Sequence, residues 1–211
     1  MTTPENLFTL ASWRREVAAL YACVRRAPLD ARAQACEHFR AAREDLFREH
    51  PDSPIQPRDR GRFPGLDYYP YDPAWRVLGV IDRNVQLENF EVDLAADGTF
   101  RYTRVARVLF SFAGHLASLS VFWIEGYGGG LFLPFQDQTS GGATFGGGRY
   151  LYDTIKGADL GAGDAELVLD FNYAYNPSCA YDERWVCPLS PSENRLSFDV
   201  QAGEKIPVAT L

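Results

Sequence analysis

A glycine-rich stretch from Phe135 to Tyr150, FQDQTSGGATFGGGRY, places polar side chains beside glycines. Glycine lets a backbone approach a ligand closely, and its exposed N–H groups can form a nest for an anion. Arg149 could hold a carboxylate or a phosphate through two N–H groups. The other candidate ligand-binding residues here are Asp137, Thr139, Ser140 and Tyr150. The structural alternative is a flexible hairpin in which Arg149 forms an ion pair. No Lys-Ser/Thr follows the glycines, so this is not a Walker A loop.

A second polar stretch, DFNYAYN, runs from Asp170 to Asn176. If a strand continues through it, Asp170 and Asn172 share one face and could point into the mouth of a barrel. The candidate ligand-binding residues here are Asp170, Asn172, Tyr175 and Asn176. Asp137 and Asp170 are the catalytic candidates, since one of two facing carboxylates can have a raised pKa and act as an acid. The alternative is turn chemistry around Asn176-Pro177.

Four cysteines offer a third kind of chemistry. Cys179 and Cys187 are separated by seven residues, and a zinc site would need two more ligands and is usually built on shorter spacings. Two alternatives to a zinc site remain open for this pair: a disulfide formed under oxidising conditions and two structural thiols. We predict no metal site, and the sequence indicates no cofactor. Cys23 and Cys36 lie on apolar stripes and are expected to be small buried hydrophobes.

Three segments must position these residues. Residues 1–50 form an N-terminal helical segment, because apolar residues recur at spacings of three and four on both sides of Pro28. Residues 51–74 form a proline-rich extended connection, and residues 75–211 form an antiparallel β domain. The arginines of the first segment, Arg43 among them, are expected on a solvated helical face with Glu44, Asp45 and Glu49 as partners.

Period-two alternation predicts strands over residues 76–81, 87–94, 100–112, 116–125, 131–135, 149–154 and 166–172. A strand over 195–200 would close the sheet, and residues 96–99 are a tight hairpin signal. Since the links are short and no helices alternate with the strands, the fold class is mostly β. We expect an antiparallel β-barrel or barrel-like sandwich with an N-terminal helical hairpin packed against it.

Composition limits the partners. The 211 residues carry a net charge of −7, which disfavours nucleic-acid binding. No apolar run approaches the ~20 residues of a membrane span, and Met1 to Leu10 show no basic segment before an apolar one. We therefore expect a cytoplasmic protein that binds neither nucleic acid nor membrane.

Several of these stretches, taken together, resemble the family called Domain of Unknown Function 1684. The resemblance rests on FQDQTSGGATFGGGRYL, LDFNYAYNPSCAY, CPLSPSENRL and AGEK in this order, preceded by HPDSPI and FPGLDYYPYDP. It covers about Phe47 to Lys205 and implies a single shared domain, without an activity to carry over. Phe145 stands where the family typically has Tyr.

These observations favour a small-molecule-binding β-barrel protein whose ligand is anionic or polar and whose pocket is lined by Tyr and Phe. They leave open whether the protein is an enzyme. The alternative is a structural or protein-interaction module without catalysis, in which the strands from Phe110 to Trp123 form the face of a homodimer.

Overall fold

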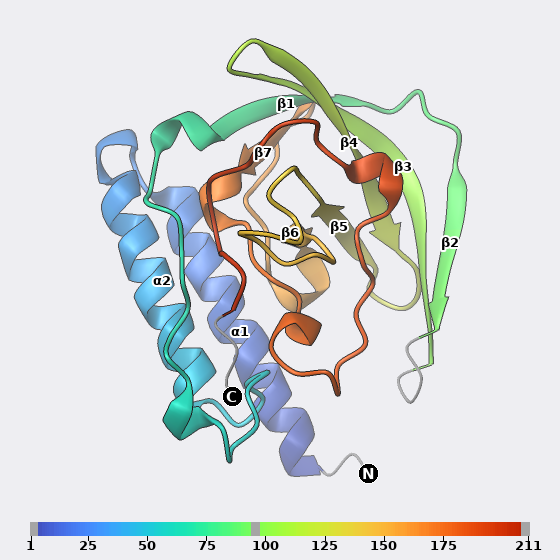
Figure 1. Cartoon of the computed structure of the whole chain (residues 1–211). Helices are drawn as coiled ribbons and strands as arrows, with labels where there is room; N and C mark the ends of the chain where they lie inside the picture. Colours follow the sequence, from blue (N-terminus) through green and yellow to red (C-terminus); the bar gives the residue numbers. More distant parts are fainter. Residues whose placement is uncertain (1–3, 94–97, 208–211) are drawn as a thin grey trace.

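An antiparallel sheet organises the chain in the computed structural model, which describes residues 4–93 and 98–207 (Figure 1). Its seven strands are β1 (Arg76–Asp82), β2 (Glu88–Asp93), β3 (Thr99–Phe112), β4 (His115–Ile124), β5 (Gly130–Phe135), β6 (Arg149–Asp153) and β7 (Glu166–Asp170). The strand order is β6-β5-β4-β3-β1-β7, and β2 pairs with β3 beside this path. The sheet curls into a half-barrel, as the sequence predicts.

The long hairpin of β3 and β4 forms the centre of the sheet. Side chains along β3 alternate between buried and more exposed positions, because one face of the strand covers the core. A bulge between Arg104 and Ala106 shifts the β3–β4 register and bends the strand. Phe110 and Phe122, expected on a dimer face, lie in the protein's own core, whereas Trp123 is exposed.

Two helices, α1 (Pro4–Arg26) and α2 (Arg32–Glu49), form the expected hairpin beside the sheet (Figure 1). Val17 and Tyr21 of α1 and Phe39 and Leu46 of α2 are buried in the main core with strand residues. Phe47 belongs to a smaller cluster with Ile55 and Phe63 of the proline-rich connection.

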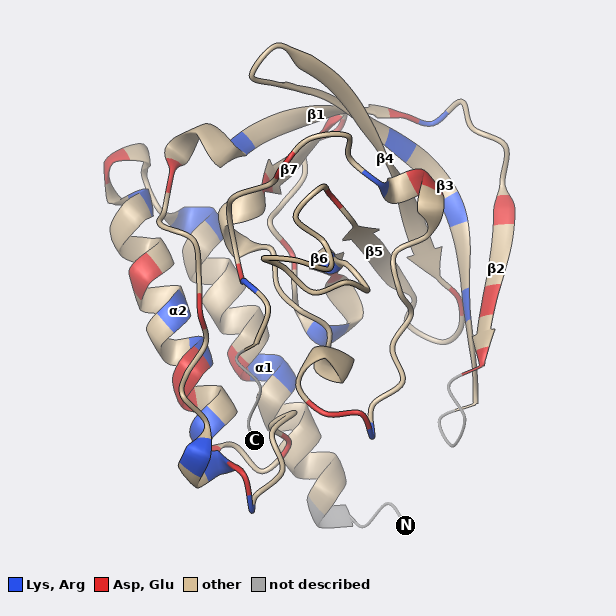
Figure 2. Ribbon diagram, in the orientation of Figure 1, with Lys and Arg blue, Asp and Glu red and all other residues tan. Residues whose placement is uncertain are grey.

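Basic and acidic positions are interspersed along the ribbons of the two helices (Figure 2). The Arg48–Glu44 pair, 2.8 Å apart, fits the predicted solvated face. Two details differ from the prediction. Cys23 is exposed rather than buried, and Arg43 is buried rather than solvated. Both differences arise because the buried face includes fewer residues of α1, and more residues of α2, than the spacing of apolar residues indicates.

The predicted closing strand over 195–200 is wrong. Only a single parallel bridge joins Arg195 to Gln136. The reason lies in Asn194, whose side chain bonds to Ser120 of β4 and Pro134 of β5 where the pairing of these strands ends. The segment after it runs beside residues 136–138 without forming a strand: Leu196 N–H donates to the carbonyl of Gln136, and Gln138 N–H donates to the carbonyl of Phe198.

The predicted strand over 166–172 is two residues too long. Strand β7 ends at Asp170, and Phe171–Tyr173 form a 3-10 turn, since the Asp170 carboxylate accepts the N–H of Asn172 at 3.1 Å. The expected alternation of Asp170 and Asn172 on one strand face is therefore wrong. The hairpin signal at 96–99 falls mainly on 94–97, outside the described residues.

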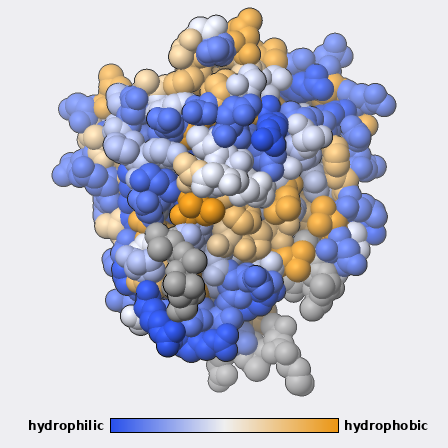
Figure 3. All heavy atoms as spheres, in the orientation of Figure 1, coloured by the Kyte–Doolittle hydropathy of each residue, from blue (hydrophilic) through white to orange (hydrophobic). Residues whose placement is uncertain are grey.

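None of the helices in the described ranges has the length and apolar character needed to cross a membrane. The face seen in Figure 3 has an apolar area near its centre, bordered by hydrophilic residues.

Candidate functional site

Asp137 and Arg149 form a buried ion pair, with Oδ2 and Nη2 2.8 Å apart. Arg149 is 1% exposed, and its terminal nitrogens also donate to the carbonyls of Val200, Ala202 and Glu204. Its two Nη groups are therefore used within the protein. The pair ties the glycine-rich loop to residues 200–204, which is the ion-pair role left open by the sequence.

The rest of the glycine-rich loop completes this network. Asp137 Oδ1 accepts the N–H and the hydroxyl of Thr139 at 2.7 and 2.5 Å, and Ser140 Oγ accepts the N–H of Asp137. Thr139 also shares a hydrogen bond with Thr144 at 2.8 Å. The loop residues proposed as ligand contacts thus bond mainly to one another.

Asp170 and Asn172 belong to a different network. The Asn172 amide donates to Asp170 Oδ1 at 2.9 Å and to the carbonyl of Asp72 at 2.8 Å, and it accepts the N–H of Asp72. Arg76 lies 3.9 Å from Asp170 Oδ2. Burial raises the pKa of the Asp170 carboxyl, although the Asn172 donors and Arg76 oppose this. These contacts fasten the proline-rich connection to the end of β7.

No hydrogen bond or ion pair among the described residues joins Asp137 or Arg149 to Asp170. Asp170 instead lines a cavity of about 310 Å³ with Arg25, Arg32 and Arg76. No buried polar atom of that cavity's described residues lacks a hydrogen-bond partner. The geometry therefore gives no support to Asp137 and Asp170 as a facing acid–base pair.

Tyr150, Tyr175 and Asn176 come together at another cavity, of about 70 Å³, between the helical hairpin and the sheet. We call it the helix–sheet pocket. Backbone hydrogen bonds in both directions pair Tyr150 with Tyr175. Helix α1 contributes Trp13, Val17 and Tyr21 to the lining, α2 contributes Arg43 and Phe47, and further lining residues include Asp153, Lys156 and Cys187.

Arg43 is the central cation of the helix–sheet pocket. Its guanidinium lies between two rings, 4.7 Å from the centroid of Phe47 and 5.0 Å from that of Tyr175. Its Nε donates to Glu204 Oε1 at 2.6 Å. Burial alone would lower the pKa of Arg43, but the Glu204 carboxylate raises it well above its ordinary value. The two terminal nitrogens make no hydrogen bond to the described residues, so they remain available as a fork of donors.

Glu204 anchors this arrangement from the C-terminal segment. Besides Arg43, its carboxylate accepts the hydroxyls of Tyr68 and Tyr181 and, at 2.8 Å, the N–H of Asn176. Gly203 precedes it with a φ of +75°, and a Cβ there would lie 2.5 Å from the carbonyl oxygen of Ala174. Glycine is required at this approach, because backbone atoms cannot move aside as a flexible side chain can.

Two residues that line the helix–sheet pocket each have one buried polar atom without a partner. Tyr21 and Asn176 are each 2% exposed, and the Tyr21 hydroxyl and Asn176 Oδ1 have no hydrogen-bond partner in the described part of the chain. The Asn176 amide nitrogen donates to the carbonyl of Lys205 at 2.7 Å, which fixes Oδ1 as the unpaired atom. Burial raises the pKa of Tyr21, so its hydroxyl keeps its proton and can donate. Buried polar atoms are usually paired, so two orphans at one cavity indicate an external partner.

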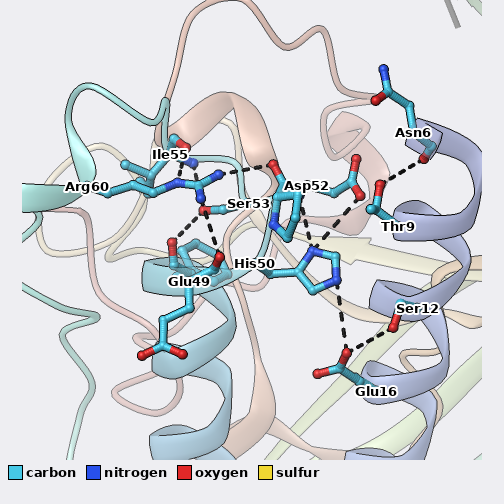
Figure 4. A network of polar contacts seen from close by, with 12 residues as sticks. Asn6, Thr9, Ser12, Glu16, Glu49, His50, Asp52, Ser53, Ile55 and Arg60 are labelled. Carbon is cyan, nitrogen blue, oxygen red and sulfur yellow. Dashed lines mark hydrogen bonds and ion pairs between the residues drawn. The ribbon is translucent and has the colours of Figure 1, made fainter. Parts of the chain in front are cut away.

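A polar network surrounds the turn after α2 (Figure 4). His50 Nδ1 accepts the N–H of Asp52, and its ring packs edge-on against Trp13 with centroids 5.2 Å apart. Ser53 Oγ donates to the carbonyl of Phe47 at 2.6 Å. Arg60 donates to the carbonyls of Glu49, Pro51 and Ile55. These bonds hold the turn after α2, so that Trp13 and Phe47 keep their places in the pocket.

The rim of the pocket carries reactive groups. Lys156 Nζ lies 3.5 Å from Asp153 Oδ2, and Cys187 lies beside them in the lining. Among the described residues, no group of three His, Cys, Asp or Glu side chains is placed to hold a metal ion.

The structure thus brings three of the predicted site residues to one pocket: Tyr150, Tyr175 and Asn176. Four others form one structural network, Asp137, Thr139, Ser140 and Arg149. Asp170 and Asn172 belong to a second network. Sequence reasoning missed Tyr21, Arg43 and Glu204. Arg43 lies at helical spacing from the apolar residues of its helix, and Glu204 lies in the AGEK segment. A buried arginine needs a buried acid as its partner, and this requirement was the signal that the sequence offered.

Comparison with known proteins agrees with this fold. A family model described as "Protein of unknown function (DUF1684)" matches residues 61–205. A solution NMR structure of an uncharacterized protein from Haloarcula marismortui is 37% identical, with a TM-score of 0.59, and the match covers 82% of this chain and 92% of that one. A search of curated proteins gave no match.

Proposed function

The chain belongs to the DUF1684 family, and because that description names no activity, we propose a function from the helix–sheet pocket: the protein binds a small carboxylate there. The observation that carries the proposal is the pair of unpaired polar atoms, Tyr21 Oη and Asn176 Oδ1, on residues that line one cavity. Each such atom costs about 1–3 kcal/mol when it is left without a partner. A ligand that bonds to both would remove this cost.

The free groups of the pocket define the chemistry of the ligand. The two terminal nitrogens of Arg43 match the two oxygens of a carboxylate, and the Tyr21 hydroxyl can donate to the same group. Asn176 Oδ1 can only accept, so it calls for a hydroxyl or an N–H on the ligand. A short 2-hydroxy acid carries both groups.

The cavity volume limits the size of the ligand. The volume is about 70 Å³, whereas an apolar cavity of about 150 Å³ binds benzene. A molecule of roughly three to five non-hydrogen atoms is therefore the expected size. Glycolate and acetate meet this limit and serve as probes.

The test is titration of the protein with glycolate, followed by isothermal calorimetry and by amide chemical shifts. We expect glycolate to bind more tightly than acetate, because its hydroxyl reaches Asn176, and we expect neutral acetamide to bind more weakly than both. Tyr21→Phe should weaken glycolate binding by about 10–100-fold, the value of one hydrogen bond to a charged group.

Tyr152→Phe is the matched control. The Tyr152 hydroxyl donates to the carbonyls of Gly161 and Val168, and the residue does not line the helix–sheet pocket. This variant should leave glycolate binding unchanged. Equal binding by wild type and Tyr21→Phe, or no binding of any probe at millimolar concentration, would refute the proposal.

A further inference from the structure

Two of the four cysteines lie together, and one of them, Cys187, lines the helix–sheet pocket. Cys179 belongs to the 3-10 turn Ser178–Ala180, and its N–H donates to Cys187 Sγ at 3.4 Å. A hydrogen bond also joins the two thiols. Both side chains are half-buried and unoxidised. The sulfurs are therefore neighbours with access to solvent.

The loop between them holds this arrangement in place. We call residues 177–188 the cysteine loop. Tyr181 donates to Glu204 at 2.6 Å, Trp185 Nε1 donates to the carbonyl of Pro54 at 3.3 Å, and the Tyr150 hydroxyl donates to the carbonyl of Pro188. Since the loop is bonded to the protein at its middle and its end, it holds the backbone of Cys179 beside the sulfur of Cys187.

The surroundings of the pair make its two sulfurs unequal. The hydrogen bond from the Cys179 thiol, backbone N–H groups and Lys156 together lower the pKa of Cys187 to about 6, against the effect of burial. The same hydrogen bond and burial raise the pKa of Cys179. The other ionisable groups near the pair are Asp153, which is paired with Lys156, and the Tyr150 hydroxyl. A thiolate beside a neutral thiol is typical of redox-active pairs.

We propose that Cys187 and Cys179 form a reversible dithiol–disulfide pair, in which Cys187 is the sulfur attacked first by an oxidant of the hydroperoxide class. The Cys187 thiolate attacks one peroxide oxygen, the O–O bond breaks, and the alkoxide leaves and takes a proton from solvent. The product is a sulfenic acid. The Cys179 sulfur then attacks the Cys187 sulfur, an S–S bond forms, and the S–O bond breaks. The departing hydroxide takes the Cys179 proton, and water is released. A dithiol reductant restores both thiols by exchange.

The other two cysteines provide internal references. Cys36 is fully buried, and burial raises its pKa to about 11, so it should not react. Cys23 is exposed. If exposure alone governed reactivity, Cys23 would react before Cys187.

The first experiment measures alkylation of the folded, reduced protein by iodoacetamide between pH 5 and 9, with peptide mass spectrometry. We expect Cys187 to label before Cys23 at pH 6.5, with a half-maximal rate near pH 6. The second treats the protein with one equivalent of hydrogen peroxide. Arg184 lies between the two cysteines in the sequence, so trypsin cuts the loop and a disulfide appears as two joined peptides. Dithiothreitol should separate them.

Variants assign the roles of the two sulfurs. Cys179→Ser should give a Cys187 sulfenic acid that dimedone traps. It should also slow alkylation at pH 6, by about fivefold for the first unit by which the pKa of Cys187 rises and about tenfold for each further unit. Cys187→Ser should leave Cys179 unreacted. Cys23→Ser should change neither the alkylation of Cys187 nor the formation of the disulfide. Circular dichroism checks that each variant is folded.

Earlier labelling of Cys23 than of Cys187 at pH 6.5 would overturn the proposal, as would joined peptides that pair other cysteines or no joined peptides at all. The proposal does not rest on carboxylate binding, which is measured on the reduced protein with glycolate. Failure of one proposal is therefore distinguishable from failure of the other.

Discussion

At the scale of single residues, Asp170 shows what burial does to a carboxylate. Its pKa is raised by burial, against the Asn172 donors and Arg76. In the unfolded chain an Asp has a pKa near 3.9. The folded state therefore holds the proton more tightly, so the contribution of Asp170 to stability is greatest below the unfolded pKa and is lost as the pH rises through the folded pKa.

Asp170→Asn removes this dependence. We expect the free energy of unfolding of the wild type, minus that of Asp170→Asn, to increase as the pH falls from 8 to 4. Urea titrations at several pH values measure the difference. Asp164→Asn, at an exposed carboxylate, is the control for removing one negative charge. A difference that is constant or decreases with acid would contradict the raised pKa of Asp170.

At the scale of elements, Asn194 joins two strands that no longer pair directly. The β4–β5 ladder stops at Phe122 and Phe132. Beyond it, the Asn194 amide accepts the N–H of Ser120 at 2.7 Å and donates to the carbonyls of Ser120 and Pro134 at 2.9 and 2.7 Å. One side chain thus replaces the missing backbone hydrogen bonds.

Asn194→Ala should lower the free energy of unfolding by about 3 kcal/mol or more, about 1 kcal/mol for each hydrogen bond. Asn194→Asp should cost more than Asn194→Ala, because a carboxylate oxygen would face two carbonyl oxygens. Denaturant unfolding measures both, with Asn84→Ala at an exposed position as control. If Asn194→Asp were as stable as wild type, the bridging role would be wrong.

The strands are also where prediction from the sequence worked best. The predicted ranges of all seven agree with the structure to within about two residues, although β5 and β6 are buried almost throughout and do not alternate. The prediction failed at 195–200, where the backbone bonds partly to residues 136–138 and partly to side chains, and at Asn172, whose N–H bonds to the Asp170 carboxylate. The site was harder, since spacing cannot show that Arg149 points at three carbonyls while Arg43 faces a pocket.

At the scale of the whole molecule, the helical hairpin and the half-barrel share one buried ion pair. Arg43 of α2 bonds to Glu204 of the C-terminal segment, and that segment bonds to Arg149 of β6. We therefore expect the helices and the sheet to unfold together, although they are separate segments of the sequence.

Arg43→Met tests this connection. It leaves the Glu204 carboxylate buried without its cation and should cost about 3–5 kcal/mol. The double variant Arg43→Met with Glu204→Gln should recover part of that loss. Helix ellipticity and the fluorescence of the remaining tryptophans should give coincident transitions in a Trp13→Phe background, since Trp13 lies on α1. Melting of the helices before the sheet would show that the ion pair does not couple them.

The same ion pair has a consequence for biosynthesis. Arg43 precedes Glu204 by 161 residues in the chain, so at roughly 5–20 residues per second the ribosome delivers the acid on the order of ten seconds after the cation. Throughout that interval the nascent hairpin presents an arginine for which no counter-ion has been translated. Burial of that face of the hairpin must therefore wait until Glu204 has emerged from the ribosome.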